Sequence, residues 1–188
     1  MKKTANKTKL IFTILLVTVA FFTMAEPKDV ISLEELAEFD MAIYIEKTHL
    51  PLDGLVLPDG TPYDSGTLQG KYALVNLWVT WCPYCRQEKA SIDRIYREQG
   101  NEELAILTVS LGEEPETVRQ YMEENHYVFP VVVDRENKLK EEYSPRLPTS
   151  YILDPKGNIL ARINGNKEWD SEQMLRVIRL LTTSGNGR

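Results

Sequence analysis

The chain has 188 residues, of which 22 are Lys or Arg and 28 are Asp or Glu, so its formal net charge is −6. A single-domain length with 43% hydrophobic and 27% charged residues excludes a disordered chain and a polytopic membrane protein. The acidic pI near 5.1 argues against general nucleic-acid binding, and two cysteines are too few for a disulfide scaffold.

Residues 1–25 are typical of an export signal. Four lysines and no acid precede an apolar run over 10–25, and Glu26 follows at once. Thr23 and Ala25 stand at the −3 and −1 positions of a predicted cleavage site. The alternative is an uncleaved membrane anchor, although a run of about 16 apolar residues is short of the roughly 20 that span a bilayer. Both interpretations predict that the folded part is exported.

The next segment, 26–50, is predicted to be a helical extension. Ser32 with Glu35 three residues later forms a capping-box pattern, which predicts a helix to about Lys47. Apolar residues recur at spacings of three and four and include Met41 and Ile45, as expected for one buried helix face.

The chain then indicates a hairpin, a buried strand and a helix. Residues 55–57 and 61–63 flank Pro58-Asp59-Gly60, which is a hairpin signal. Residues 72–79 (YALVNLWV) are almost continuously apolar, and such a run predicts a central strand covered on both faces. A helix is expected over 83–99, ended by Gly100.

The remainder alternates strands and helices. We expect strands at 104–111, 128–133, 151–153 and 159–163, and helices at 116–125, 135–143 and 170–181. Pro115 suits a first helical position, Asp154-Pro155-Lys156-Gly157 a hairpin turn, and Asp170 an N-cap with Gln173 at N3. Residues 184–188 read as a polar tail. This order predicts an α/β fold, a mixed sheet with helices on both faces.

Cys82-Pro83-Tyr84-Cys85 stands where the central strand should pass into the following helix. Cys82 would lie at the helix N-terminus, where free N–H groups and the helix dipole favour a thiolate. Cys85 would lie one turn inside the helix, less exposed but within reach for a disulfide. The spacing therefore predicts a redox-active pair, with Cys82 as nucleophile and Cys85 as resolving thiol.

Two other interpretations of this cysteine pair, a structural disulfide and a zinc site, have less support than redox chemistry. A structural disulfide across two residues closes almost no loop and would stabilise little. A zinc site needs four ligands, and His49 and His126 are isolated and far apart in the sequence. No dissociable cofactor and no metal are therefore expected.

The segment 76–88 (NLWVTWCPYCRQE) resembles the active-site segment of the TlpA/ResA-like thioredoxin-fold thiol-disulfide oxidoreductases. The resemblance continues over 51–181 and includes 147–160 (LPTSYILDPKGNIL). It implies a thioredoxin-like domain over 51–183, with one inserted helix-strand unit at 116–133. It also implies an extracytoplasmic protein, periplasmic or membrane-anchored, that reduces disulfides in envelope proteins and is recharged by a membrane electron donor. Cytochrome c maturation is one candidate for the process in which such a protein would act.

The resemblance also assigns roles to single residues. Glu88, six residues after Cys82, would relay protons for Cys85, the alternative being an exposed helix residue. Asn76 takes the place of a buried Asp and would hydrogen-bond without titrating. Pro148 matches a cis-proline beside the disulfide. Substrate contacts are expected from the residues around these positions: Trp81, Pro83, Tyr84, Leu147 and Pro148.

Two alternatives remain open at this point. The Pro83-Tyr84 dipeptide also occurs in glutaredoxins and in disulfide isomerases, so an isomerase or oxidase is one. A non-enzymatic binding module gated by the redox state of the pair is the other. A measured reduction potential distinguishes an isomerase or oxidase from a reductase. Turnover of a disulfide substrate distinguishes an enzyme from a binding module, which would not exchange electrons.

Overall fold

The computed structural model describes residues 37–99 and 104–184. The predicted signal or anchor, the Ser32–Glu35 capping box, Gly100 and the tail after 184 lie outside these residues. Within the described ranges, no helix has the length and apolarity that crossing a membrane requires.

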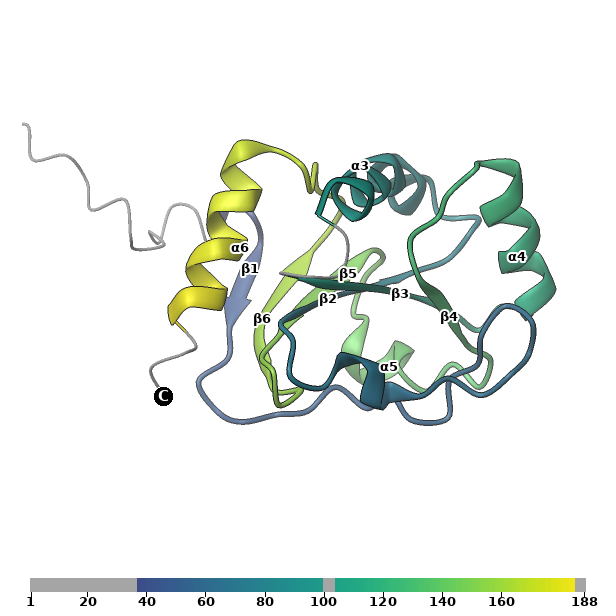
Figure 1. The fold of residues 1–188 in the computed structure, drawn as a ribbon, viewed down its shortest axis with the longest axis horizontal. Coiled ribbons are helices and arrows are strands. Elements are labelled where there is room, and N and C mark those ends of the chain that lie inside the picture. The colour runs from purple at the N-terminus through teal and green to yellow at the C-terminus, as the bar shows by residue number, and fades with distance from the viewer. Residues whose placement is uncertain (1–36, 100–103, 185–188) are drawn as a thin grey trace, which may run out of the picture. The chain divides into compact units, whose positions relative to one another are not determined.

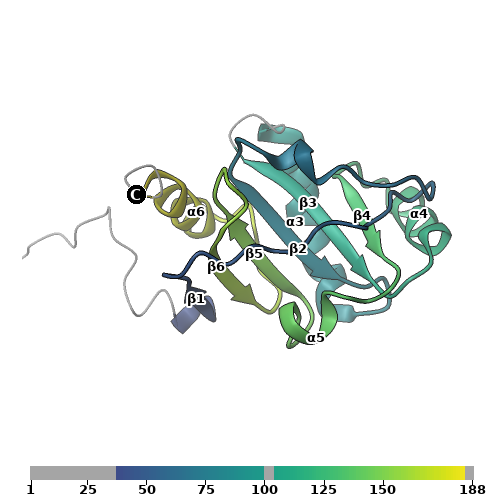
Figure 2. The same ribbon diagram turned by 90° about the horizontal axis from the view of Figure 1, so that it is seen from below.

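One mixed sheet of six strands organises the described residues, in the order β1-β6-β5-β2-β3-β4 (Figure 2). Parallel pairing joins β2 to β3 and β3 to β4, whereas β5 lies antiparallel to β2, β6 to β5 and β1 to β6. The strands are β1 (Met41–Ile43), β2 (Ala73–Trp78), β3 (Ala105–Leu111), β4 (Val131–Asp134), β5 (Thr149–Leu153) and β6 (Ile159–Asn164).

The strand β2 is central, as its apolar run predicts. All six of its residues are buried, because β3 and β5 flank it in the sheet and other elements cover both its faces. The parallel β2–β3 register places Ala73 opposite Ala105 and Trp78 opposite Ser110. Both strands therefore end at the same edge of the sheet, which is where α3 begins.

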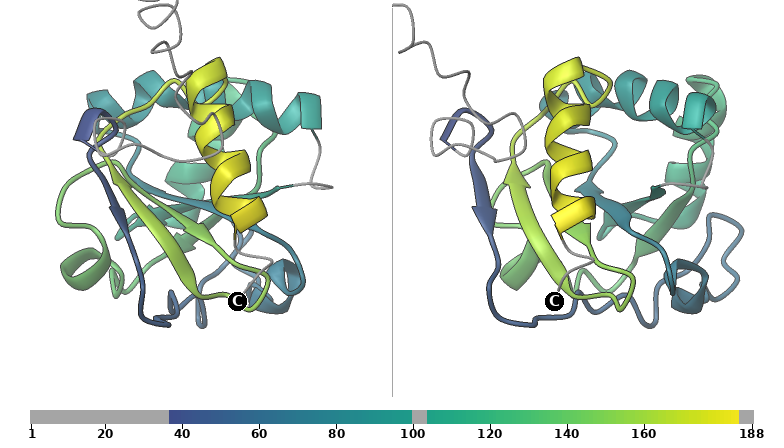
Figure 3. Two further views of the ribbon diagram at one scale, coloured as in Figure 1. Left: turned by 90° about the vertical axis from the view of Figure 1, so that its left-hand side faces the viewer. Right: turned by 60° about the vertical axis from the view of Figure 1, so that its left-hand side comes forward.

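Helices cover both faces of the sheet, as expected. The helices are α3 (Pro83–Gln99), α4 (Pro115–Glu124), α5 (Lys140–Tyr143) and α6 (Glu172–Ser184), with a short 3-10 helix η1 (Ser65–Leu68). Figure 1 shows α3, α4 and α6 on one face and α5 on the other. Figure 3 shows α6 at a steep angle to α3 on their shared face.

The helix predicted to run to Lys47 is wrong from Phe39 onward, where a turn replaces it. Residues 41–43 form the edge strand β1, in which Met41 pairs with Ile163 of β6. Ile45, expected on the buried helix face, is 86% exposed. Antiparallel pairing with a strand 120 residues later in the chain overrides the local helical pattern, so 26–50 is not a purely helical extension.

Three smaller predictions also need correction. The helix expected over 135–143 is formed only at Lys140–Tyr143. Ser171, and not Asp170, caps α6, because the Ser171 hydroxyl accepts from the Met174 N–H while Asp170 binds Arg94. The strand expected at 128–133 is Val131–Asp134, since pairing with β3 begins only at Val131.

Both hairpins are confirmed. The turn at 58–60 joins Val56 and Pro62 in an antiparallel bridge, and Val56 also bridges Val133 at the end of β4. The strands β5 and β6 pair across 154–157, where the Asp154 carboxylate accepts from the Lys156 N–H. Figure 2 shows that the segment between β1 and β2 crosses the face of the sheet opposite α3.

Candidate active site

The two cysteines lie where β2 passes into α3, as predicted. Pro83 opens α3, and the Arg86 N–H donates to the Cys82 carbonyl, so Cys82 stands at the N-terminus of the helix. The Cys85 N–H points to the Cys82 sulfur, with N and Sγ 3.3 Å apart. A backbone N–H of the first helical turn is thus directed at the Cys82 sulfur.

The cysteines differ in exposure and in electrostatics. Both are unpaired thiols; Cys82 is 6% exposed and Cys85 is completely buried. Burial raises the pKa of Cys85 well above its usual range, the hydrogen bond with Cys82 raises it further, and the charge of Lys89 opposes the rise. The Cys85 thiol therefore needs a nearby proton acceptor before it can attack.

The loop before Cys82 is held by Glu113, which follows the end of β3. One Glu113 oxygen accepts from the Thr80 N–H at 2.9 Å and from the Ser110 hydroxyl at 2.6 Å. The other accepts from the Thr80 hydroxyl at 2.6 Å. The Glu113 carboxylate thus ties the loop that leads from β2 to Cys82 to the end of the neighbouring strand β3.

Exposed aromatic side chains border the buried pair. Trp81 is 71% exposed and Tyr84 is 61% exposed, and Pro83 between them also faces solvent. Exposed aromatic rings beside a reactive thiol suit contact with a partner protein.

The segment before β5 lies at the same end of the sheet. Thr149 pairs with Leu77, so Pro148 falls beside the end of β2 from which the cysteine loop leaves. The Leu147–Pro148 bond is cis, as predicted. Pro148 is buried and Leu147 is half-buried.

Asn76, Glu88 and Lys89 form a buried polar group beneath the cysteines. The Asn76 Nδ2 donates to Glu88 Oε1 at 2.7 Å and to the Ser150 hydroxyl at 2.8 Å. The Asn76 Oδ1 accepts from the Lys89 ammonium. Asn76 thus makes the hydrogen bonds that the sequence predicts, while its role in the reaction stays a prediction. Glu88 is buried and not an exposed helix residue.

Glu88 is held by hydrogen bonds from two other parts of the fold, β2 and the segment before α6. Besides Asn76 of β2, the Trp169 Nε1 donates to Glu88 Oε2 at 3.0 Å and the Lys167 N–H at 3.2 Å, both from the segment before α6. Burial raises the pKa of Glu88, although Lys89 and these hydrogen bonds oppose the rise. A carboxyl with a raised pKa binds a proton more readily than an exposed one, which suits a proton acceptor.

Lys89 and Glu113 were not predicted as site residues. The signal for Lys89 is its spacing, because it follows Cys85 by four and precedes Ile92 by three, which puts it on the buried helix face. No local signal exists for Glu113, whose partner Thr80 is 33 residues away in the sequence.

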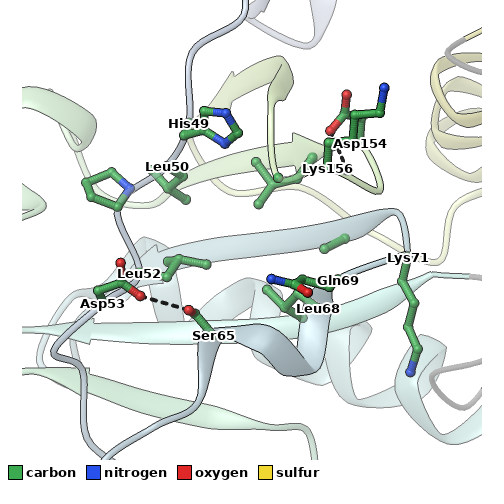
Figure 4. A pocket seen from close by; sticks show the side chains of 14 residues that line it. His49, Leu50, Leu52, Asp53, Ser65, Leu68, Gln69, Lys71, Asp154 and Lys156 are labelled. Carbon is green, nitrogen blue, oxygen red and sulfur yellow. Dashed lines mark hydrogen bonds between the residues drawn. The ribbon is translucent and has the colours of Figure 1, made fainter.

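A cavity of about 390 Å³ lies at the opposite end of the sheet (Figure 4). It is lined by Ala73 at the start of β2 and by residues such as His49, Asp53 and Lys71. In Figure 4 the Asp53 carboxylate accepts from the Ser65 hydroxyl at 2.8 Å. No cysteine lines this cavity, and the described residues hold no cluster of three or more His, Cys, Asp or Glu that would suit a metal.

Comparisons with known proteins agree with this geometry. Residues 45–178 match the Redoxin family. Thiol-disulfide oxidoreductase ResA of Geobacillus kaustophilus is 30% identical over 146 residues, which cover 72% of this chain and 83% of that protein.

Two solved structures extend the comparison. The exposed lipoprotein thioredoxin Etrx1 of Streptococcus pneumoniae is 29% identical, with a TM-score of 0.56, and the match covers 66% of this chain and 96% of that one. A thiol:disulfide interchange protein of Chlorobium tepidum shares the fold at 23% identity, with a TM-score of 0.58 and coverage of 73% and 96%.

Proposed function

This chain belongs to the Redoxin family and is a thioredoxin-like thiol-disulfide oxidoreductase, and from this premise we propose that it reduces disulfides of partner proteins outside the cytoplasm. The observation that carries the proposal is the unequal pair of thiols. Cys82 stands at a helix N-terminus with an N–H on its sulfur, and Cys85 is fully buried one turn further. This arrangement provides a nucleophile and a resolving thiol.

In the first step, the Cys82 thiolate attacks one sulfur of the partner's disulfide. A bond forms between the Cys82 sulfur and that partner sulfur, and the partner's own S–S bond breaks. The second partner sulfur leaves with the electron pair and takes up a proton. Exposed Trp81 and Tyr84 supply the surface on which the partner rests during this mixed disulfide.

In the second step, Cys85 loses its proton and attacks the Cys82 sulfur. The Cys82–Cys85 disulfide forms, and the first partner sulfur leaves as a thiolate that takes up a proton. Glu88 accepts the Cys85 proton, because its buried carboxyl lies on the same helix one turn from the thiol. The partner gains two electrons and the protein loses two.

Action outside the cytoplasm is supported by the basic and apolar N-terminal sequence, which either a cleaved signal or a membrane tether would explain. The relative from Streptococcus pneumoniae is described as an exposed lipoprotein. Return to the dithiol form requires an electron donor, and for an exported protein that donor is most simply a membrane protein. The partners are disulfide-containing envelope proteins, with apocytochromes c as one candidate class.

Trapping the mixed disulfide tests the proposal. A Cys85→Ser variant expressed with its natural N-terminus lacks the resolving thiol, so it should accumulate disulfide-linked partners that reductant releases. The matched control is the Cys82→Ser/Cys85→Ser double variant, which should trap none. Equal trapping by both variants, or no turnover of a disulfide-containing protein by the wild type, would refute the proposal.

A further inference from the structure

Lys89 is a completely buried lysine that the two steps above do not use. It follows Cys85 by one helical turn and so shares its helix face. Its Nζ lies 4.4 Å from the centre of the Trp78 ring and 3.8 Å from Glu88 Oε1. Burial of an ammonium is costly unless an opposite charge and hydrogen bonds compensate it, and Glu88 supplies that charge.

Asn76 joins the two charged groups. Its amide donates to Glu88 Oε1 at 2.7 Å, and its carbonyl oxygen accepts from the Lys89 ammonium. Only a side chain with both a donor and an acceptor can bind a carboxylate and an ammonium together, which an ionised Asp at this position could not do. Asn76, Glu88 and Lys89 therefore form one buried, hydrogen-bonded group with a net charge of zero when both ends are ionised.

We propose that Lys89 is a positioning residue for the exchange reaction, in which its ammonium holds Glu88 as the carboxylate that accepts the Cys85 proton. The proton passes from the Cys85 sulfur to a Glu88 oxygen, and the Cys85 thiolate then displaces the partner sulfur from Cys82. The buried charges before and after this transfer sum to the same value, so the step does not create net charge in the protein interior. The inference rests on the role given to Glu88 in the proposed function.

The charged neighbours of the pair support this role. Glu88 faces Lys89 on α3 and Lys167 in the segment before α6, and the Lys167 ammonium is itself bound to the Asn164 carbonyl. Lys89 faces Glu88 and both cysteines. Burial raises the pKa of Glu88 and Lys89 opposes that rise, so removal of Lys89 should raise the pKa of this carboxyl further and favour its protonated form.

Reaction with dithiobisnitrobenzoate, an aromatic disulfide, resolves the two steps. Attack by Cys82 releases one coloured thionitrobenzoate at a rate proportional to reagent concentration. Attack by Cys85 on the resulting mixed disulfide releases the second at a rate independent of reagent concentration. The first phase reports the exchange chemistry itself, and the second reports the step that Lys89 is proposed to assist.

The test variant is Lys89→Met, which keeps a long unbranched side chain and removes the charge. At about pH 7 its second phase should be about tenfold slower than that of the wild type, as expected for a one-unit change in proton affinity. The ratio of the wild-type rate to the variant rate in this phase should fall by up to about tenfold per pH unit as pH rises, because Glu88 then ionises even without the charge of Lys89. Lys140→Met, which changes an exposed lysine on the opposite face, is the matched control and should follow the wild type.

A second phase slowed by the same factor at every pH would assign Lys89 a packing role and overturn the inference, as would an unchanged second phase. Loss of the first phase in the wild type would instead contradict the exchange chemistry of Cys82.

A measurement that does not need a folded Lys89 variant is the infrared difference between wild type and Glu88→Gln at about pH 7. A carboxylate band is expected, and a protonated carboxyl band would overturn the inference.

Discussion

Cys82 and Cys85 are separated by one helical turn, yet their thiols should react very differently. Cys82 is slightly exposed, whereas Cys85 is completely buried and its pKa is raised by burial. Since the thiolate is the reactive form, iodoacetamide should modify Cys82 first in the reduced protein at neutral pH. Mass spectrometry of peptides from a timed reaction gives the order. In Cys82→Ser, Cys85 should stay unmodified over the same time; faster labelling of Cys85 than of Cys82 in the wild type would reverse the roles.

Lys89 should also make the free energy of unfolding depend on pH in a defined direction. Burial lowers the pKa of Lys89 to about 8, whereas a lysine in the unfolded chain titrates near 10.4. Between these values the unfolded state binds more protons, so this lysine makes the free energy of unfolding rise with pH, by up to about 1.4 kcal/mol per unit. Lys89→Met lacks this contribution.

Urea unfolding at several pH values from about 8 to about 10 measures the effect. The stability of the wild type relative to Lys89→Met should increase across this window. Tyrosines and cysteines titrate in both proteins and largely cancel in the difference. Lys140→Met serves as the control, whose difference from the wild type should stay constant. A wild-type advantage that falls as pH rises would show that Lys89 is not the group that titrates.

At the scale of elements, the Glu113 carboxylate joins the end of β3 to the loop that leads into α3. Glu113→Ala removes the acceptor of two Thr80 hydrogen bonds and one Ser110 hydrogen bond, and should cost about 2 kcal/mol of stability. Glu114→Ala is the matched control, because Glu114 is exposed and pairs only with exposed Arg135 among the contacts described; it should cost less than about 0.5 kcal/mol. Equal costs in urea unfolding would contradict the anchoring role.

The edge strand β1 makes a second prediction at this scale. A helix over this segment would bury Met41 and Ile45 together, whereas the strand buries Met41 against β6 and leaves Ile45 exposed. Met41→Ala should therefore cost about 2 kcal/mol, and Ile45→Ala less than about 0.5 kcal/mol. Thermal and urea unfolding of the two variants compare them directly, and similar losses would favour the helix.

For the whole molecule, the direction of electron flow is set by the relative stability of the dithiol and disulfide forms. A strong oxidant owes its potential to a stabilised reduced form. The similarity to a ResA-type thiol-disulfide oxidoreductase and the buried acid Glu88 favour the reducing direction for this protein. Equilibration with glutathione should therefore give a potential nearer to about −270 mV than to about −120 mV. A value at the oxidising end would favour the isomerase or oxidase alternative.

The sequence by itself determined the central part of the fold and the location of the cysteines. The apolar run of β2, the Cys82–Cys85 spacing and the turn at 154–157 are local signals, and the structure confirms each of them. Such signals survive because burial on both faces, helix initiation and tight turns depend mainly on residues close together in the chain. The same holds for Asn76, the one polar residue of this apolar run, which stands six residues before Cys82.

Only the tertiary structure decided β1, the Glu113 anchor and the surroundings of Glu88. Met41 pairs with Ile163, Glu113 binds Thr80, and Glu88 accepts from Trp169, so each depends on a partner 33 to 122 residues away. For Lys89, the sequence spacing predicts a place on the buried helix face. It does not predict that the Glu88 carboxylate and the Asn76 amide lie close enough to compensate the buried charge. Long-range pairing and desolvation in the assembled core outweigh local preference at these positions, since their energies arise only when distant segments meet.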